Sequence, residues 1–425
     1  MTSSSVASTS VGSSKSNAVG KGGRGTPMKV LLLENIHPHA KEIFKTAGFE
    51  VETQAGAFTE AQLREKIADV HVLGIRSKTN VTASVLAEAK NLLAVGAFCI
   101  GTNQIDLEAA KSRGIVVFNA PFGNTRSVAE LMLAEIVMLS RQLGNRTMEM
   151  HQKSWKKVSK DCHEVRGKTL GIVGYGHIGS QVSTLAEAFG MRVVFHDILS
   201  KLPLGNARPA NGLVNLLRES DFVTLHVPET PQTMNMIGPE EIAQMKKGAY
   251  LLNASRGTVV QIPALAEALR SGHLAGAAID VFPTEPENNT DNFVTELQGI
   301  PNVILTPHIG GATEEAQANI GEEVPTALVR YVLTGATSGA VNFPQVDLAP
   351  TSGSHRILNV HRNVPGVLRD VTRIVSDLGA NISAQTLATD GDIGYLVLDT
   401  DQELSADVKA RIEELKTSIR TRMLY

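Results

Sequence analysis

Three polar clusters in the second half of the chain each follow a short apolar run directly. They are Asn253-Ala-Ser-Arg-Gly257, Asp280-Val-Phe-Pro-Thr-Glu-Pro286 and Thr306-Pro-His-Ile-Gly-Gly311. Short apolar runs that alternate with helical patterns predict strands of a parallel sheet. Because the carboxyl ends of parallel strands line one crevice, an Arg, a Glu and a His that are far apart in sequence can converge there.

These three side chains suit the oxidation of a 2-hydroxy acid. His308 can take the hydroxyl proton, because the reference pKa of histidine lies near ~6.5. Glu285 can orient the imidazole and stabilise its protonated form, and Arg256 can hold a carboxylate with its planar guanidinium. Each residue alone would more often be an ordinary surface or core residue. Their joint placement predicts Arg256, Glu285 and His308 as catalytic residues.

A glycine-rich turn precedes these clusters. The strand predicted at 169–173 leads into Gly174-Tyr-Gly-His-Ile-Gly179, and Asp197 follows the next predicted strand. A strand, such a turn, a helix and an acid about 20 residues later are typical of a dinucleotide site. The glycines let the backbone approach a pyrophosphate, and the helix N-terminus offers N–H donors. Asp197 would accept hydrogen bonds from ribose hydroxyls and repel a 2′-phosphate, which predicts NAD rather than NADP. A glycine turn in an unrelated α/β protein is the alternative.

The predicted cofactor-binding residues share the carboxyl edge of this sheet. They are Gly174, Gly176, His177, Ile178, Gly179, Asp197, Ala254, Ser255, Arg256, Asp280, His308, Gly310 and Gly311.

The elements around these residues predict an α/β protein with two doubly wound parallel sheets. Strands are expected at 29–33 and 71–75, and then at 169–173, 192–196, 222–226, 249–253, 276–280 and 303–305. Apolar helices at 126–139 and 314–333 would carry the chain between the two sheets. The first domain would then be discontinuous, with residues 27–123 and 312–345 in a substrate-binding domain and residues 124–311 in the NAD-binding domain.

The C-terminal residues follow a different pattern. After a linker at 346–354, strands are expected at 356–360, 381–388, 394–398 and 418–424, with helices at 364–378 and 405–416. This βαββαβ order is typical of a ferredoxin-like unit over residues 355–425.

Composition narrows the class of protein further. The chain has 425 residues, 42% of them hydrophobic, and a formal net charge of −3 without a long charged run. Neither nucleic acid nor a membrane is therefore expected as a partner. The two cysteines, Cys99 and Cys162, form no paired motif, which predicts neither a disulfide framework nor a metal site and favours the cytoplasm. Residues 1–26 are predicted to be a disordered extension, and a transit peptide stays open as the alternative.

From Met28 onward the chain resembles the D-isomer-specific 2-hydroxyacid dehydrogenases, in the branch that oxidises 3-phosphoglycerate and carries a C-terminal ACT domain. The matching stretches include the glycine-rich turn at 174–179, the motif at 306–311, and the longer stretches 253–260 and 278–286 around the other two clusters. Two further matches are Phe98-Cys-Ile-Gly-Thr-Asn103 and Phe118-Asn-Ala-Pro-Phe-Gly-Asn-Thr-Arg-Ser-Val-Ala-Glu130. The resemblance implies the same catalytic triad, NAD as cofactor, and 3-phosphohydroxypyruvate as product at the entry to L-serine biosynthesis. It also implies a side activity on 2-oxoglutarate and a homotetramer, in which the arm that carries Trp155 reaches a neighbouring subunit. An ordinary half-buried packing residue is the alternative for Trp155.

The phosphorylated substrate implied by the resemblance needs additional cations. Arg76 and Lys78, after the strand predicted at 71–75, are the candidates. The family pattern has Arg at both positions, so Lys78 departs from it and loses bidentate geometry while it keeps the charge. A solvated loop without a ligand is the alternative.

Serine-sensing ACT domains resemble the segment around His361, Asn363 and Asn381, which implies L-serine as an effector bound by these three residues. Asn363 is predicted to cap the following helix, and Pro365 to lie in its first turn. A capping Asn without a ligand is the alternative.

Two other functions stay open. The chain could be a different NAD-dependent D-2-hydroxyacid dehydrogenase of this fold. It could also be a nucleotide-sensing corepressor, because a fold does not determine a function.

Overall fold

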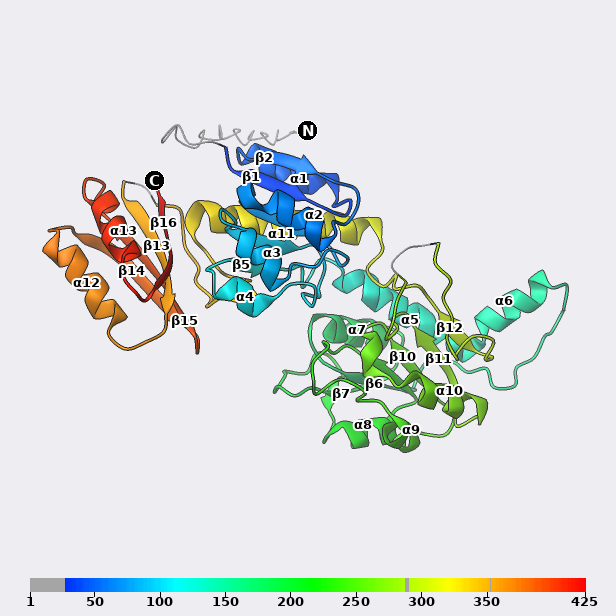
Figure 1. Ribbon diagram of the computed structural model, residues 1–425. Helices are drawn as coiled ribbons and strands as arrows, with labels where there is room; N and C mark the ends of the chain where they lie inside the picture. Colours follow the sequence, from blue (N-terminus) through cyan, green and yellow to red (C-terminus); the bar gives the residue numbers. More distant parts are fainter. Residues whose placement is uncertain (1–26, 287–289, 352) are drawn as a thin grey trace, which may run out of the picture.

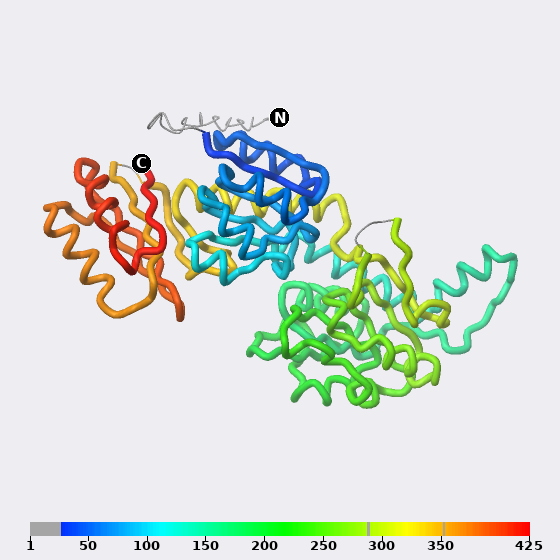
Figure 2. Tube along the Cα trace, viewed as in Figure 1, coloured from blue at the N-terminus to red at the C-terminus, as the bar shows by residue number. Residues whose placement is uncertain are grey.

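The computed structural model describes residues 27–286, 290–351 and 353–425 (Figure 1). The extension predicted at residues 1–26 lies outside the described residues. The chain forms one sheet, crosses to a second, returns along a long helix to the first, and ends in a third (Figure 2). Among the described residues, none of the helices has the length and apolar character needed to cross a membrane.

The first sheet is parallel and has the strand order β2-β1-β3-β4-β5. Its strands are β1 (Lys29–Leu32), β2 (Glu50–Thr53), β3 (Val72–Ile75), β4 (Ala94–Ala97) and β5 (Val116–Phe118). The helices between them are α1 (Pro38–Thr46), α2 (Glu60–Lys66), the 3-10 turn η1 (Ile67–Asp69), α3 (Ala83–Glu88) and α4 (Leu107–Lys111). Buried side chains cover both faces, as the doubly wound prediction requires.

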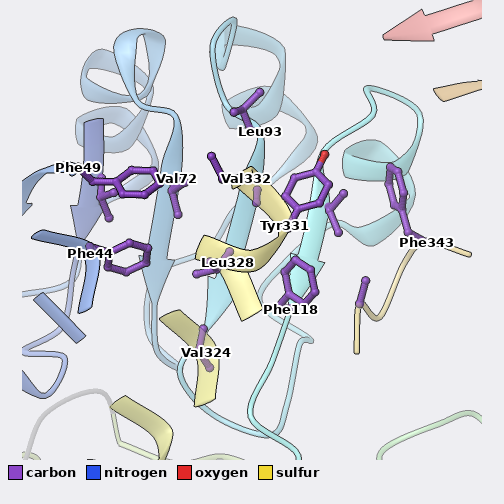
Figure 3. Packing of buried hydrophobic residues seen from close by; sticks show 14 of the residues in the cluster. Phe44, Phe49, Val72, Leu93, Phe118, Val324, Leu328, Tyr331, Val332 and Phe343 are labelled. Carbon is purple, nitrogen blue, oxygen red and sulfur yellow. The ribbon is translucent and has the colours of Figure 1, made fainter. Parts of the chain in front are cut away.

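Helix α11 (Glu314–Thr334) closes one face of this first sheet. Figure 3 shows Val324, Leu328 and Tyr331 of α11 among side chains of the early strands and of α1. The ring of Phe118 lies 6.1 Å from that of Tyr331. Residues from both ends of the predicted discontinuous domain therefore share one core.

The second sheet is also parallel, with the order β12-β11-β10-β9-β6-β7-β8. Its strands are β6 (Thr169–Val173), β7 (Arg192–His196), β8 (Arg208–Pro209), β9 (Phe222–Leu225), β10 (Ala249–Asn253), β11 (Leu274–Ile279) and β12 (Val303–Leu305). The helices are α5 (Thr125–Arg141), α6 (Leu143–His151), α7 (His177–Ala188), α8 (Leu213–Glu219), α9 (Pro239–Gln244), η2 (Gly257–Val259) and α10 (Ile262–Arg270). The strand order reverses between β6 and β9, which is where such folds bind ligands.

The third sheet is antiparallel, with the order β14-β15-β13-β16. It contains β13 (His355–Arg362), α12 (Val367–Asp377), β14 (Ile382–Thr389), β15 (Ile393–Thr400), α13 (Ser405–Glu413) and β16 (Ser418–Leu424). This order confirms the predicted ferredoxin-like unit, and with the two parallel sheets it confirms the predicted fold class. The domain boundaries themselves stay predictions.

The third sheet packs directly against the first part of the molecule. The face opposite α12 and α13 contributes Leu358, Val360 and Tyr395 to the core that contains α11. The hydroxyl of Tyr395 donates to the carbonyl oxygen of Gly335 at 2.6 Å. Lys111 of α4 pairs with Asp390 at 2.9 Å and Asp392 at 2.7 Å, in the turn between β14 and β15.

Candidate active site

The predicted catalytic residues follow three neighbouring strands of the second sheet. β10, β11 and β12 lie side by side, so the segments after Asn253, Ile279 and Leu305 leave the sheet at the same edge. At this edge His308 Nδ1 lies 2.8 Å from Glu285 Oε2. The convergence that the sequence predicted for these two residues is therefore present.

The Glu285 carboxylate is fixed on both sides. Its other oxygen, Oε1, accepts the backbone N–H of Phe282 at 3.1 Å. The hydrogen bond with Glu285 raises the pKa of His308 above its ordinary value. Burial is the largest single influence on Glu285 and acts to raise its pKa, but the hydrogen bonds from His308 and Phe282 together with the nearby positive charges outweigh burial, so the pKa is lowered. The His308 side chain is 53% exposed, so its ring is accessible from solvent.

Arg256 completes the group. Its Nη1 donates to the carbonyl oxygen of Ser255 at 2.6 Å. A Cβ added to Gly101 would lie 2.9 Å from its other terminal nitrogen, so the guanidinium reaches the loop after β4 of the first sheet. The positive charge of Arg256 acts to lower the pKa of both Glu285 and His308. A cation, a carboxylate and an imidazole thus lie together at this edge, where Arg256 also approaches the loop after β4 of the first sheet.

The glycine-rich turn lies between β6 and α7, at the point where the strand order reverses. Gly174 has a φ of +90°, and a Cβ there would lie 2.3 Å from the carbonyl oxygen of His226. A Cβ on Gly179 would lie 2.1 Å from the carbonyl oxygen of Gly174. A Cβ on Gly176 would meet nothing within 4 Å, so this glycine faces open space at the start of α7. The turn therefore fits a pyrophosphate at the helix N-terminus, and no other residue type fits its two packed positions.

Asp197 lies beside this turn at the end of β7. Its Oδ2 accepts the backbone N–H of Tyr175 at 2.8 Å, and its Oδ1 accepts that of Leu199 at 2.9 Å. His177 begins α7, and its ring lies 4.3 Å from that of Phe122, which comes from the segment before α5. The acid that the sequence predicted for ribose binding is therefore next to the pyrophosphate turn.

Asp280 stabilises the loop after β12 at the catalytic edge. The residue is 1% exposed, and its carboxylate accepts hydrogen bonds from Thr306 Oγ1 at 2.6 Å and from the N–H groups of Ile309 and Gly310 at 2.8 Å each. The backbone N–H of His308 donates to the carbonyl oxygen of Asp280 at 2.8 Å. Asp280 thus holds the loop that presents His308. Ala254, Ser255 and Gly311 lie on the same edge.

The two predicted phosphate cations follow β3 of the first sheet. Gln104 Nε2 donates to the carbonyl oxygen of Arg76 at 2.6 Å and to that of Gly101 at 3.3 Å. Gln104 therefore ties the loop of Arg76 and Lys78 to the loop that faces Arg256. No sequence motif marks this glutamine.

His226, a half-buried residue at the same edge of the second sheet, was not singled out by the sequence. It follows β9 directly, its Nε2 lies 3.0 Å from Thr224 Oγ1, and burial lowers its pKa to about 3. Its position at the carboxyl end of a central strand is the signal that could have drawn attention to it. The ring is neutral at physiological pH.

The predicted effector residues differ in part from expectation. Helix α12 begins at Val367, and its N-cap is Gly366 without a side-chain hydrogen bond, so the predicted cap at Asn363 is wrong. The Asn363 side-chain amide donates to the carbonyl oxygen of Asp390 at 2.6 Å, and its backbone N–H donates to that of Asp392 at 2.8 Å. These bonds join Asn363 to the turn between β14 and β15, and Pro365 lies in the turn before the helix.

The other two effector residues have different environments. His361 is 4% exposed and packs on Gly394, where a Cβ would lie 2.2 Å from the ring. Asn381 is exposed just before β14, and its backbone N–H donates to Asp401 Oδ2 at 3.1 Å. Both Asn363 and Asn381 are accessible, whereas His361 is buried.

Comparison with known proteins agrees with this geometry. A family model described as the NAD-binding domain of D-isomer-specific 2-hydroxyacid dehydrogenases matches residues 133–310. A model of the ACT domain similar to that of the AHAS small subunit matches residues 357–420.

Several relatives match almost the whole chain. D-3-phosphoglycerate dehydrogenase of Dictyostelium discoideum is 58% identical over 398 residues, which cover 94% of this chain and 97% of that protein. The protein of the same name from Escherichia coli K12 is 51% identical over 401 residues, with 94% and 98% covered. D-lactate dehydrogenase from Aquifex aeolicus, solved with NAD and lactic acid, is 30% identical with a TM-score of 0.63, covering 71% of this chain and 95% of that one.

Proposed function

This chain belongs to the D-isomer-specific 2-hydroxyacid dehydrogenase family, and we propose that it uses Arg256, Glu285 and His308 to oxidise 3-phospho-D-glycerate to 3-phosphohydroxypyruvate with NAD. Relatives at 51% and 58% identity, each spanning 94% of this chain, carry the name of that activity. The reaction is the first step of L-serine biosynthesis. The observation that carries the catalytic assignment is the 2.8 Å bond between Glu285 and His308 beside Arg256.

The residues divide the chemistry as follows. Glu285 occupies His308 Nδ1, so Nε2 is the nitrogen left to take the proton of the substrate hydroxyl. The carboxylate stabilises the imidazolium that this transfer creates, which is the effect that raises the pKa of His308. Arg256 binds the substrate carboxylate and fixes the carbon that is oxidised. The turn at Gly174–Gly179 and Asp197 would hold NAD, which would accept the hydride.

The phosphate of the substrate is assigned to Arg76 and Lys78. Both follow β3 at the edge of the first sheet that faces Arg256, and Gln104 links the two loops. A lysine in place of arginine at position 78 keeps the charge but offers a point contact rather than a fork, which favours weaker phosphate binding. The distal carboxylate of 2-oxoglutarate would find the same cations, which supports its reduction as a side activity.

L-serine is the proposed effector of the ACT domain. The turn before α12 offers the exposed amide of Asn363 and the N–H groups of a helix N-terminus, and Asn381 adds a second exposed amide. Together they suit a small amino acid with a hydroxyl group. His361 has a reduced role in this proposal, because its ring is buried and its Nδ1 lies 3.0 Å from the carbonyl oxygen of Arg362.

A homotetramer is the proposed assembly. Helix α6 and the segment after it project away from the second sheet (Figure 1), and Trp155 in this segment is 81% exposed. An exposed tryptophan on a projecting arm suits a contact with another subunit. Light scattering of the purified protein tests the assembly. Location in the cytoplasm, with import through residues 1–26 as the alternative, stays a prediction that imaging of a tagged protein would test.

The test of the proposed reaction is a substrate panel followed by NADH absorbance. Oxidation is measured at alkaline pH with 3-phosphoglycerate, D-glycerate and D-lactate, and reduction with 3-phosphohydroxypyruvate. We expect the phosphorylated substrates to have the highest kcat/KM, because only they engage Arg76 and Lys78. An equal or higher kcat/KM for an unphosphorylated acid would show that the substrate assignment is wrong.

A further inference from the structure

A buried carboxylate lies directly below the loop that carries the two phosphate cations. Glu34 follows β1, is 7% exposed, and adopts a left-handed φ of +63°. Its Oε1 accepts the backbone N–H groups of Arg76 at 3.2 Å and Thr79 at 2.9 Å, and its Oε2 accepts that of Lys78 at 3.0 Å. In the loop of residues 76–79, the side chain of Glu34 therefore accepts hydrogen bonds from three of the four backbone N–H groups.

Sheet topology makes this contact possible. β1 and β3 are neighbours in the first sheet, so the residues after each strand leave at the same edge. Glu34 and the residues it binds are separated by 42 to 45 positions in sequence. Both Glu34 and Asn35 have positive φ, a conformation that L-residues rarely adopt without a compensating interaction. Three charge-assisted hydrogen bonds to a carboxylate are such an interaction.

The loop is also held from its other side. Gln104 Nε2 donates to the carbonyl oxygen of Arg76 at 2.6 Å, while the backbone N–H of Val81 donates to the carbonyl oxygen of Gln104 at 2.8 Å. Glu34 therefore accepts hydrogen bonds from the N–H groups of Arg76, Lys78 and Thr79, while Gln104 donates one to the carbonyl oxygen of Arg76. The backbone of Arg76 and Lys78 has little freedom left, although the Lys78 side chain is exposed.

From this geometry we infer that Glu34 is a positioning residue for phosphate recognition. It fixes the backbone from which Arg76 and Lys78 extend together, so the two like charges are held in place before a doubly charged phosphate arrives. Glu34 does not touch the substrate, because both its oxygens accept backbone bonds and the residue is buried. This inference rests on the proposed 3-phosphoglycerate substrate and adds the residue that orients its phosphate site.

The substitution Glu34→Gln tests it. The amide keeps one acceptor oxygen but replaces the other with a nitrogen that only donates, so at least one loop N–H loses its partner. We expect KM for 3-phosphoglycerate to rise about 10- to 100-fold, the effect of losing one hydrogen bond to a charged group. The kcat should stay within about threefold and KM for NAD should not change, because the triad and the cofactor turn lie on the other sheet.

Two further variants separate positioning from general stability. Glu50→Gln is the matched control, because Glu50 is exposed at the opposite end of the neighbouring strand β2, and its kinetics should equal the wild type. The double variant Glu34→Gln with Lys78→Met should be no worse than the poorer single variant, because Glu34 acts through the loop that presents Lys78. If Glu34→Gln is insoluble, Glu34→Asp is used instead. This variant keeps the negative charge but shortens the side chain by one methylene, so a smaller rise in KM for 3-phosphoglycerate is expected.

The outcomes are distinct. An unchanged KM for 3-phosphoglycerate, an equal rise in KM for NAD, or additive effects in the double variant each overturn the role of Glu34. If the wild type does not oxidise 3-phosphoglycerate, the proposed substrate is wrong and this inference falls with it. If the wild type does and the variant keeps its KM, only the inference about Glu34 falls.

Discussion

The cofactor turn before α7 and the turn before α12 both place a glycine where a strand leads into a helix, but their surroundings differ. At the first turn, a Cβ on Gly179 would lie 2.1 Å from a backbone carbonyl oxygen. At the second, a Cβ on Gly366 would meet only the guanidinium of Arg369, at 3.3 Å. Backbone atoms cannot move aside, whereas the end of an arginine can. The packing therefore allows only one backbone conformation at the cofactor turn, whereas the effector turn can accommodate a side chain in place of its glycine.

The same contrast extends to the polar groups around each turn. At the catalytic edge, Asp280 and Glu285 hold the loops that carry the reacting side chains. At the effector turn, Asn363 is exposed and is joined to a neighbouring turn by two hydrogen bonds to carbonyl oxygens. Substitutions at the catalytic edge should therefore abolish activity, whereas substitutions at the effector turn should change only its regulation. The following predictions test this difference, from the largest effect to the smallest.

His308→Asn should give the largest loss of activity, because it removes the general base at the catalytic edge. We expect kcat to fall about 10²- to 10⁴-fold while NAD binding is kept. Steady-state kinetics and calorimetric NAD titration measure the two quantities. His39→Asn, at an exposed position of α1, is the matched control and should behave as wild type. Wild-type turnover by His308→Asn would exclude His308 as the base.

Gly179→Ala compared with Gly366→Ala tests the comparison itself. The first variant places a methyl group against a backbone oxygen, so KM for NAD should rise about 100-fold or the protein should lose several kcal/mol of stability. The second meets only the strain of a φ of +96°, about 1–2 kcal/mol, and its basal kcat should be unchanged. Thermal melts and NAD kinetics of both variants are the measurements. Equal tolerance at both positions would contradict the proposed difference.

Exchange of the acid beside the cofactor turn should change cofactor preference. In Asp197→Ser with Ile198→Arg, the charge that repels a 2′-phosphate is replaced by one that attracts it. The ratio of kcat/KM for NAD to that for NADP should fall by about 10-fold or more. The single variant Ile198→Arg, which keeps Asp197, is the control and should stay closer to the wild type. A ratio that does not change in the double variant would mean that Asp197 does not contact the ribose.

Glu285→Gln should shift the pH dependence of the reaction. Neutral His308 is the base in oxidation, so wild-type kcat/KM decreases as the pH falls through the raised pKa of His308. Without the carboxylate that raises this pKa, the acidic limb of the profile should move to lower pH, and kcat should fall because the imidazolium loses its partner. Initial rates across pH measure both effects. If the acidic limb of the variant's profile stays at the wild-type pH, Glu285 does not set the pKa of His308.

Substitutions at the effector turn should have the smallest effect on catalysis. Asn363→Ala with Asn381→Ala removes two exposed amides, so inhibition by L-serine should be lost. Inhibition requires that serine binds a less active arrangement more tightly than the active one. A serine titration of activity on wild type and double variant is the test. If the wild type is indifferent to millimolar serine, or if both proteins are inhibited equally, the effector proposal fails while the dehydrogenase assignment stands.

The triad could be predicted from sequence because its geometry follows from sheet topology alone. Once 249–253, 276–280 and 303–305 were recognised as parallel strands, Arg256, Glu285 and His308 had to emerge at one edge. The cofactor turn was equally predictable, because close backbone approach leaves glycine as the residue that fits. The cap at Asn363 was predicted wrongly, since local helix rules do not include the tertiary hydrogen bonds to the turn between β14 and β15.

The sequence by itself determined most strands of the second sheet, the two helices that carry the chain between the parallel sheets, the order βαββαβ at the C-terminus and the residue types of the catalytic edge. All of these depend on periodicity and on short motifs, which are local properties of the chain. Only the tertiary structure decided that Glu34 holds the loop of Arg76 and Lys78, that Gln104 ties this loop to the one facing Arg256, and that Lys111 joins α4 to the third sheet. Each of these contacts joins segments far apart in sequence, so it exists only because strand order and packing bring those segments together.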